Sequence, residues 1–385
     1  MKQGWEIKKL GEVCTIERGG SPRPIQNYLT EADDGINWIK IGDATEGSKH
    51  ITSTKEKIKP EGMKKSRFVH KGDFILSNSM SFGRPYILAV DGCIHDGWLV
   101  IHDNDNRFDK NYLYYYLGSP NIYTEFKRLA VGGVVNNLNS ELVRNVKVCI
   151  PPLVEQEKIV AELDCLSGVI EKKKQQLKEL DALAQSIFYT MFGDPITNEK
   201  GWEVKKVNEV APQQEYIGDV PCQNGKYWLL NLDMVAPNTG EVIEQCLFEN
   251  DEIGNSTIKF NSDNVLYSKL RPYLNKVVVP NEIGYATSEL VPLCPKKEVL
   301  NRVFFALLLR SSHFVKYISS KVAGAKMPRV AMGEFREFAV ILPPLTLQQE
   351  FATKIDAIEK QKELIKKSIE KTEILFNSRM DYYFN

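Results

Sequence analysis

The sequence predicts an α+β protein in which two similar α/β domains are separated by a pair of long antiparallel coiled-coil helices. Three observations predict it. A long helical pattern of apolar residues follows Pro151-Pro152-Leu153. The same pattern returns 192 residues later, after Pro343-Pro344-Leu345. The segments that precede the two helical patterns also correspond, so the chain is a tandem repeat with a pseudo-twofold axis.

Each helical stretch carries apolar side chains at alternating steps of four and three residues, which is the heptad seam of a coiled coil. Lys173 is a polar break in the first seam, and Lys362 falls within the second. Proline at each junction suits a helix start, because a first-turn residue needs no N–H donor. The seam residues are Ile159, Leu163, Leu166, Ile170, Leu177, Leu180 and Ile187, followed in the second copy by Phe351, Ile355, Ile358, Ile365 and Ile369.

The two helices are expected to pair within one chain. A helix of roughly 37 residues is about 55 Å long, whereas the linker that follows it can reach at most about 28 Å. The second domain therefore begins near the far end of the first helix, and the second helix buries its apolar stripe by running back antiparallel. A homodimeric coiled coil is the alternative, but the linker gives intramolecular pairing a high effective concentration.

The repeat sets the domain boundaries. The predicted segments are a first domain at 1–150, a helix at 151–192, a linker at 193–200, a second domain at 201–342 and a second helix at 343–385. Within the domains, strands are expected at 38–43 and 72–76 with counterparts at 228–233 and 262–266, and helices at 111–129 and 303–322. Arg84-Pro85-Tyr86 is aligned with Arg271-Pro272-Tyr273 at a slightly different offset.

The composition predicts a soluble cytoplasmic protein. Of 385 residues, 43% are hydrophobic and 26% are charged, and the net charge is zero. The sequence shows neither a signal peptide nor an apolar run long enough to span a membrane. Seven cysteines, an odd number without Cys-x-x-Cys spacing, indicate reduced thiols and argue against a zinc site.

Motifs for catalysis are missing from the sequence. It contains no phosphate-binding loop, no dinucleotide fingerprint and no amino-methyltransferase signature. The five histidines lack metal-ligand spacing, so no metal and no cofactor is expected. His95-Asp96 and His102-Asp103 could each be a base with its orienting acid, but ordinary strand-end residues are the favoured interpretation. Glu203-x-Lys205 after Asp194 resembles a nuclease motif, but it is better explained as a repeated strand.

Two basic stretches suit contacts with DNA phosphates. From Lys40 to Lys71, nine Lys and Arg oppose four acids, a net charge of +5. From Arg310 to Arg336, six bases oppose one acid, again +5. Ser, Asn, Tyr and Gly are interleaved with these charges, a mixture that suits phosphate contacts together with base-edge readout. For any single lysine in these stretches, the alternative to a DNA contact is a position in a solvent-exposed loop without a binding role.

Several motifs in this order resemble the specificity subunit of type I restriction–modification systems. They are the opening Gly4-Trp5-Glu6, the loop Arg18-Gly19-Gly20-Ser21-Pro22, the Pro-Pro-Leu-x-x-Gln junctions that end at Gln156 and Gln348, and Phe192-Gly193-Asp194-Pro195 followed by Gly201-Trp202-Glu203. Each motif is weak by itself, whereas the ordered set, largely present twice, is specific. The resemblance covers the whole chain.

The resemblance implies a division of labour. Each globular unit would be a target recognition domain that reads one half of a split, asymmetric site on double-stranded DNA, with the gap set by the helix pair. The helices would dock two methyltransferase (modification) subunits that carry S-adenosylmethionine. Separate restriction subunits would use ATP and Mg²⁺ to translocate and cut DNA. This chain would then be a non-catalytic subunit without cofactors of its own.

The resemblance assigns only broad roles to residues, with Arg and Asn side chains expected at base edges and Lys at phosphates. For Arg84-Pro85-Tyr86, a structural turn with its tyrosine in the core is the alternative. The first half-site is assigned Arg18, Arg23, Lys40, Lys65, Arg67, Asn78, Ser81, Arg84, Tyr86, Asn136, Asn137 and Asn139, and the second Tyr267, Lys269, Arg271, Tyr273, Lys326 and Arg329.

Two rival functions stay open at this point. One is the recognition subunit of a related type II system that cuts on both sides of its site. The other is a coiled-coil scaffold with two ligand-binding heads and no DNA role. The affinity of a DNA-binding subunit falls steeply as salt rises, whereas a scaffold shows no such salt-dependent binding.

Overall fold

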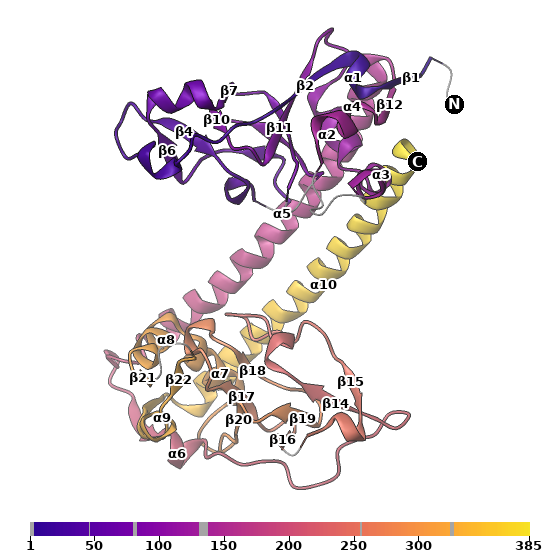
Figure 1. Cartoon of the computed structure of the whole chain (residues 1–385). Coiled ribbons are helices and arrows are strands. Elements are labelled where there is room, and N and C mark those ends of the chain that lie inside the picture. Colours follow the sequence, from indigo (N-terminus) through magenta and orange to yellow (C-terminus); the bar gives the residue numbers. More distant parts are fainter. Residues whose placement is uncertain (1–3, 46, 80–82, 131–137, 255, 324–326) are drawn as a thin grey trace. The chain divides into compact units, whose positions relative to one another are not determined.

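The structure is a computed structural model that describes residues 4–45, 47–79, 83–130, 138–254, 256–323 and 327–385 (Figure 1). The chain forms two compact units. The first unit comprises residues 1–172 and 369–385, and the second comprises residues 173–368. Each unit therefore contains one globular part and a part of each long helix, and each is described by itself below.

Among its described residues, the first unit contains three sheets and four short α-helices. The first sheet pairs β1 (Glu6–Lys9) with β12 (Lys147–Ile150), and the second has the order β2 (Cys14–Arg18), β11 (Trp98–Asp103), β8 (Phe74–Ser77), β9 (Pro85–Leu88), β5 (His50–Ile51). The third has the order β3 (Leu29–Thr30), β6 (Glu56–Ile58), β4 (Ile36–Ile39), β10 (Gly92–Ile94), β7 (Arg67–Val69). The helices are α1 (Leu10–Val13), α2 (Lys110–Leu117), α3 (Pro120–Ala130) and α4 (Ser140–Arg144).

Alternation along the central strands gives one sheet of the first unit a buried cluster on each face. Leu76 of β8 and Leu99 of β11 belong to a cluster with the helices. Their neighbours Ile75 and Trp98 belong to a separate cluster. Successive side chains of a strand point to opposite faces, so one sheet supports both clusters.

The described residues of the second unit follow a similar plan, with four sheets in place of three. The first sheet pairs β13 (Glu203–Lys206) with β23 (Ala339–Leu342), and the second has the order β15 (Leu247–Glu249), β14 (Lys226–Leu230), β19 (Gly284–Thr287), β16 (Thr257–Phe260). The third has the order β18 (Val277–Val278), β17 (Val265–Ser268), β20 (Leu290–Leu293). The fourth pairs β21 (Val322–Ala323) with β22 (Arg329–Val330). The short helices of this unit are α6 (Val207–Val210), α7 (Arg302–Arg310), α8 (Ser312–Ser319) and α9 (Met332–Glu337). The parallel pair β4–β10 returns as β14–β19.

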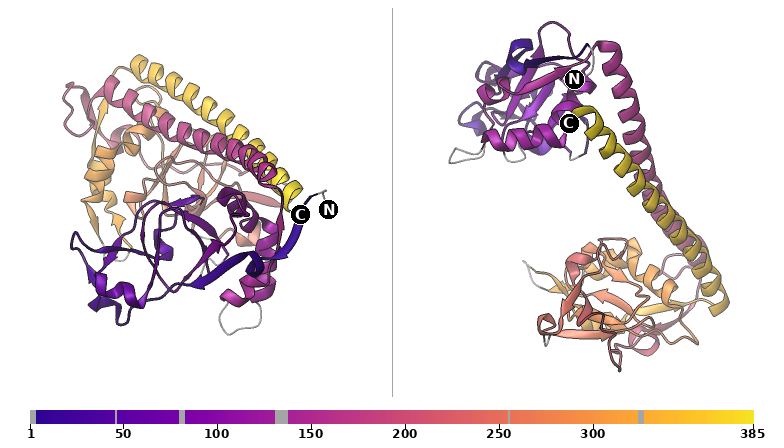
Figure 2. Two further views of the ribbon diagram at one scale, coloured as in Figure 1. Left: turned by 90° about the horizontal axis from the view of Figure 1, so that it is seen from above. Right: turned by 90° about the vertical axis from the view of Figure 1, so that its right-hand side faces the viewer.

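The long helices are α5 (Leu153–Phe192) and α10 (Leu345–Phe384), and each begins directly after its Pro-Pro pair. Within the second unit they run antiparallel, because Phe192 contacts Phe351 while Asp181 contacts Lys362 farther along α10 (Figure 2). Within the first unit, Glu162 near the beginning of α5 binds Arg379 near the end of α10. The predicted antiparallel pair of long helices is confirmed.

The residues of the predicted seam are all buried or half-buried. Ile159, Leu163, Ile170, Phe351, Ile355, Ile358 and Ile369 are buried, and Leu166, Leu177, Leu180, Ile187 and Ile365 are half-buried. Both polar positions have partners within the second unit. Lys173 donates to the hydroxyl of Ser368, and the buried Lys362 donates to Asp181 at 2.7 Å and to Glu359 at 3.0 Å. The lysines are thus paired inside the seam.

The single helices expected at 111–129 and 303–322 are wrong in extent. In the first unit, α2 ends before Gly118, and Pro120 begins the new helix α3 because proline has no N–H to continue the old one. In the second unit, the side chain of Ser311 accepts a hydrogen bond from the N–H of Phe314 and begins α8. Asp109 and Asn301 cap the preceding helices in the same way.

A buried glutamine fixes each junction between a globular part and its long helix. Gln348 donates from Nε2 to the carbonyl of Pro343 at 2.8 Å and to that of Val299 at 3.1 Å, and its Oε1 accepts from the N–H of Asn301 at 2.8 Å. Gln156 makes the same three bonds in the first unit. The side chain thus satisfies backbone groups that burial would otherwise leave unpaired.

Replacing Gln348 with Ala is expected to lower the free energy of unfolding of the second unit by about 2 kcal/mol, because it leaves buried backbone groups without partners. Glu350→Ala on the same helix removes only an exposed ion pair with Lys354 and is expected to change stability by less than about 0.5 kcal/mol. Scanning calorimetry of both variants checks this prediction. Equal shifts in the unfolding temperature would contradict it.

Candidate nucleic-acid interface

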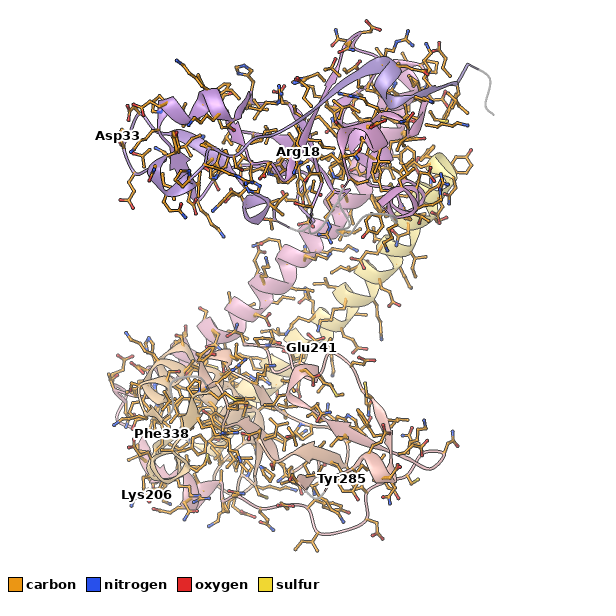
Figure 3. The ribbon with its side chains drawn as sticks, in the orientation of Figure 1. Arg18, Asp33, Lys206, Glu241, Tyr285 and Phe338 are labelled. Carbon is orange, nitrogen blue, oxygen red and sulfur yellow. The ribbon has the colours of Figure 1, made fainter. Side chains whose placement is uncertain are left out.

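In the first unit, arginines gather around the turn that leads from β10 into β11. Arg18 stands at the end of β2 (Figure 3), and its Nε donates to the backbone carbonyl of Asp96 at 2.9 Å. Arg23, which is largely exposed, places Nη2 3.6 Å from the Asp96 carboxylate. Ser21 donates to the same carboxylate at 2.8 Å. The loop of residues 18–23 is therefore anchored on Asp96 and leaves Arg23 open to solvent.

His95 is part of the same turn. Its Nδ1 accepts the N–H of Gly97 at 2.9 Å, so Nε2 carries the proton and donates to Asp96 at 2.9 Å. Burial lowers the pKa of the His95 imidazole, against the effect of Asp96. Burial alone would raise the pKa of the Asp96 carboxyl, but the hydrogen bond from Ser21 and the nearby His95 and arginines hold it below its usual value. These hydrogen bonds hold His95 and Asp96 in fixed positions within the turn.

Three further residues assigned to the first half-site have partners in their own unit. Arg67 binds Glu17 at 2.8 Å, Lys65 donates to the hydroxyl of Tyr28 at 2.6 Å, and Lys40 pairs with Glu56. Lys65 is exposed, and Arg67 and Lys40 are half-buried. Each could contact a phosphate only by exchanging or sharing its present partner.

In the second unit, the corresponding cluster is built on Glu289, directly before β20. Both carboxylate oxygens accept from Arg329, at 2.8 Å from Nη2 and 3.4 Å from Nε. The backbone carbonyl of Glu289 accepts the N–H of Lys269 at 3.0 Å. The hydrogen bond from Arg329 holds the pKa of the Glu289 carboxyl below its usual value, although burial acts against this, and Lys269 adds to the lowering.

Arg271 and Tyr273 complete the second cluster on the turn after β17. Arg271 has the left-handed backbone conformation, with φ of 49°, and its N–H bonds the carbonyl of Pro328 at 2.8 Å. Its side chain is exposed and has no partner within the described residues. Tyr273 is also exposed. The turn thus presents a cation and an aromatic ring to solvent next to Arg329.

Three assigned side chains are corrected by their burial. Tyr86 lies in a core cluster with its ring edge-on to Trp98 at 5.7 Å, and Tyr267 stacks on Phe335 at 4.5 Å. Asn78 is buried and donates to the backbone carbonyl of Asp96 at 3.1 Å. None of the three is open to DNA, so they position the turns from inside. Asn139 is exposed, but its side chain caps α4 by accepting from the N–H of Leu142.

Of the remaining residues assigned to DNA binding, one is described by the structure and four are not. Arg84 is exposed at the beginning of β9. Ser81, Asn136, Asn137 and Lys326 lie outside the described residues. Sequence reasoning missed Asp96 and Glu289, the carboxylates on which the clusters are built. The available signal was an acid one or two residues before an apolar strand in each copy.

The structure shows two further properties. Across the described ranges, no three His, Cys, Asp or Glu side chains gather as metal ligands. None of the helices, as far as the structure describes them, has the length and apolar character that crossing a membrane requires.

Comparison with known proteins gives a consistent result. The family model described as "Type I restriction modification DNA specificity domain" matches residues 2–182 and 199–373. The MjaIX type I restriction enzyme specificity subunit of Methanocaldococcus jannaschii is 22% identical over 90% of this chain and 85% of its own length. The EcoDI specificity subunit of Escherichia coli is 20% identical over 60% of each chain.

Two solved structures share the fold. The S subunit of a type I restriction–modification system from M. genitalium superposes with a TM-score of 0.59 at 12% identity, covering 99% of this chain and 96% of the other. A chain from a structure concerning complex assembly and conformational transition of a type I R-M system gives a TM-score of 0.58 at 19% identity, covering 100% and 98%. At these identities the likeness supports the fold.

Proposed function

Because this chain belongs to the family of type I restriction modification DNA specificity domains, we propose that each of its two units recognises one half of a bipartite DNA site. The chain is the sequence-specificity subunit of a type I restriction–modification enzyme. The main support for a bipartite site is that the family model matches the chain twice, once in each repeat. One recognition domain per repeat means two half-sites per chain.

The proposed site is asymmetric, because the two clusters differ in their residues. The first unit offers Arg18 and Arg23 around an aspartate, whereas the second offers Arg329 on a glutamate and Arg271 on the turn after β17. Arginine in a major groove is suited to guanine, and the surrounding turns differ in length and sequence. Two unlike surfaces would recognise two unlike half-sites.

The proposed complex contains double-stranded DNA, two methyltransferase subunits and restriction subunits. S-adenosylmethionine, ATP and Mg²⁺ would act on those partners, and this chain would contribute recognition without catalysis. The relatives named above are type I subunits, which gives no support to a type II recognition subunit or to a scaffold without a DNA role.

Methylome sequencing of the host with and without the gene tests this function. We expect one split, adenine-methylated motif to disappear when the gene is deleted and to return with the wild-type gene. A purified complex should also bind the motif with an affinity that falls steeply as salt rises. An unchanged methylome, together with no salt-dependent DNA binding, would exclude the proposed function.

Replacing Arg271 with Ala is expected to weaken recognition at one half-site only, by about 1–3 kcal/mol if its guanidinium reads a base. Binding should be measured on duplexes in which one half-site at a time is randomised. Lys297→Ala removes another exposed cation of the same unit, paired with Asp263, and serves as control. A uniform loss on all duplexes would instead assign Arg271 to a phosphate.

A further inference from the structure

Each unit places one carboxylate in the short turn that leads into the strand beside its arginines. In the first unit this is Asp96, two residues before β11, and in the second it is Glu289, directly before β20. Both carboxylates are mostly buried at their turns, with side chains 27% and 23% exposed. Both repeats therefore place an acidic side chain within the cluster that is proposed to bind DNA, which is itself negatively charged.

Glu289 restrains its arginine by geometry. Arg329 approaches the carboxylate with two nitrogens of its guanidinium, and a paired contact of this kind fixes the orientation of the side chain. The exposed side of the guanidinium remains open, since about half of the Arg329 side chain is accessible. Arg329 is therefore held in a defined position while it can still be reached.

Asp96 is fixed more firmly than the arginine it faces. Its Oδ1 accepts from Ser21 and from His95, and its backbone carbonyl accepts from Arg18. Its Oδ2 is 3.6 Å from Arg23, whose side chain is 82% exposed. The carboxylate is thus built into the turn, and Arg23 is the member of the pair that can move.

We propose that Asp96 and Glu289 are specificity-determining residues that weaken the binding of non-cognate DNA by holding Arg23 and Arg329 against a fixed negative charge. The proposal rests on the proposed function, because it concerns the same DNA-binding clusters. On arbitrary DNA, a phosphate must compete with the carboxylate for the arginine and is repelled by it. On the cognate half-site, an amino group of a base, such as N4 of cytosine, can donate to the carboxylate and remove this penalty.

This arrangement raises specificity by disfavouring the wrong partners. Without the carboxylate, the arginine would be free to neutralise one more phosphate of any sequence. Each additional neutralised phosphate steepens the dependence of log affinity on log salt by about 0.9. The two carboxylates should act independently, because each belongs to its own unit and its own half-site.

The test uses the full chain in complex with its methyltransferase subunits and the variants Asp96→Asn and Glu289→Gln. Fluorescence anisotropy over a salt series would measure binding to the cognate duplex, to a fully randomised duplex, and to duplexes with one randomised half. We expect each variant to bind the randomised duplex about fivefold more tightly, with a salt slope steeper by about 0.9. Each should lose discrimination at its own half only.

Two further variants keep this test decisive. Glu337→Gln removes an exposed acid of the second unit that pairs with Lys206, and it should leave both affinities unchanged. Glu289→Gln combined with Arg329→Ala should return the affinity for the randomised duplex to near the wild-type value, because the released cation is gone. An increase with Glu337→Gln as large as with Glu289→Gln would reduce the effect to overall charge and overturn the proposal.

The outcomes distinguish a failure of the proposed function from a failure of the proposed role of the two carboxylates. If the wild-type complex does not distinguish the methylated motif from the randomised duplex, the proposed function fails. If the wild type distinguishes them, but Asp96→Asn and Glu289→Gln leave the affinity for the randomised duplex and the salt slope unchanged, only the role of the carboxylates is refuted.

Discussion

Replacing Phe351 with Ala is expected to destabilise the second unit by about 3–5 kcal/mol, the usual range for deleting a fully buried aromatic ring. Phe351 lies at the beginning of α10 and is 0% exposed. Its ring centroid is 5.2 Å from that of Phe192, 5.8 Å from Phe188 and 6.4 Å from Phe304. The side chain therefore joins the end of α5, the beginning of α10 and α7.

Hydrogen exchange followed by mass spectrometry would measure the effect in each unit separately. In Phe351→Ala, the amides of β17, β20 and α7 should exchange faster, whereas those of β8 and β11 in the first unit should keep their protection. Leu364→Ala on the same helix is the matched control, because Leu364 is 68% exposed. Similar losses in both variants, or equal loss in both units, would contradict the prediction.

The long helices could be predicted from the sequence because their signal is long and local. A heptad pattern over some forty residues, about eleven turns of helix, leaves little ambiguity, and its return after 192 residues gives an independent confirmation. Short helices have no such redundancy. The stretch with Tyr112 and Phe126 looked continuous, although Pro120 begins a second helix there.

The candidate interface was predicted only in part, because burial in a short loop depends on which strand pairs with which. The two Arg-Pro-Tyr triplets illustrate this. In the first copy, Pro85 pairs with Leu76 and Tyr86 enters the core. In the second, the strand that pairs with Tyr267 begins at Val277, and the triplet forms a turn in which Pro272 is buried and Tyr273 is exposed. The same Arg-Pro-Tyr tripeptide therefore has a different structural environment in each copy.

The carboxylates at the centres of both clusters escaped prediction for a related reason. A search for DNA-binding residues selects cationic and amide side chains. Such a search passes over acidic residues, because a carboxylate repels the DNA phosphates. The significance of Glu289 is visible only when its two contacts with Arg329 are known. Ion pairing across some forty residues of sequence is a tertiary property that no local pattern encodes.

Lengthening both long helices by about one heptad is expected to change the DNA motif itself. Both α5 and α10 pass from one unit into the other, at residues 172–173 and 368–369. About seven added residues keep the heptad phase and add about 10 Å of helix. At about 3.4 Å per base pair, we expect the preferred gap between the half-sites to grow by about three base pairs, with both half-sites unchanged.

The design of the insertions follows from the pairing of the helices. Insertion into both helices preserves the contact of Glu162 with Arg379 in the first unit and that of Asp181 with Lys362 in the second. Insertion into α5 alone would force one of these pairs out of register, and this variant should lose methylation altogether. Methylome sequencing reads the outcome directly. A double insertion that still methylates the original gap would show that the helix pair does not set the spacing, while leaving the recognition role of each unit intact.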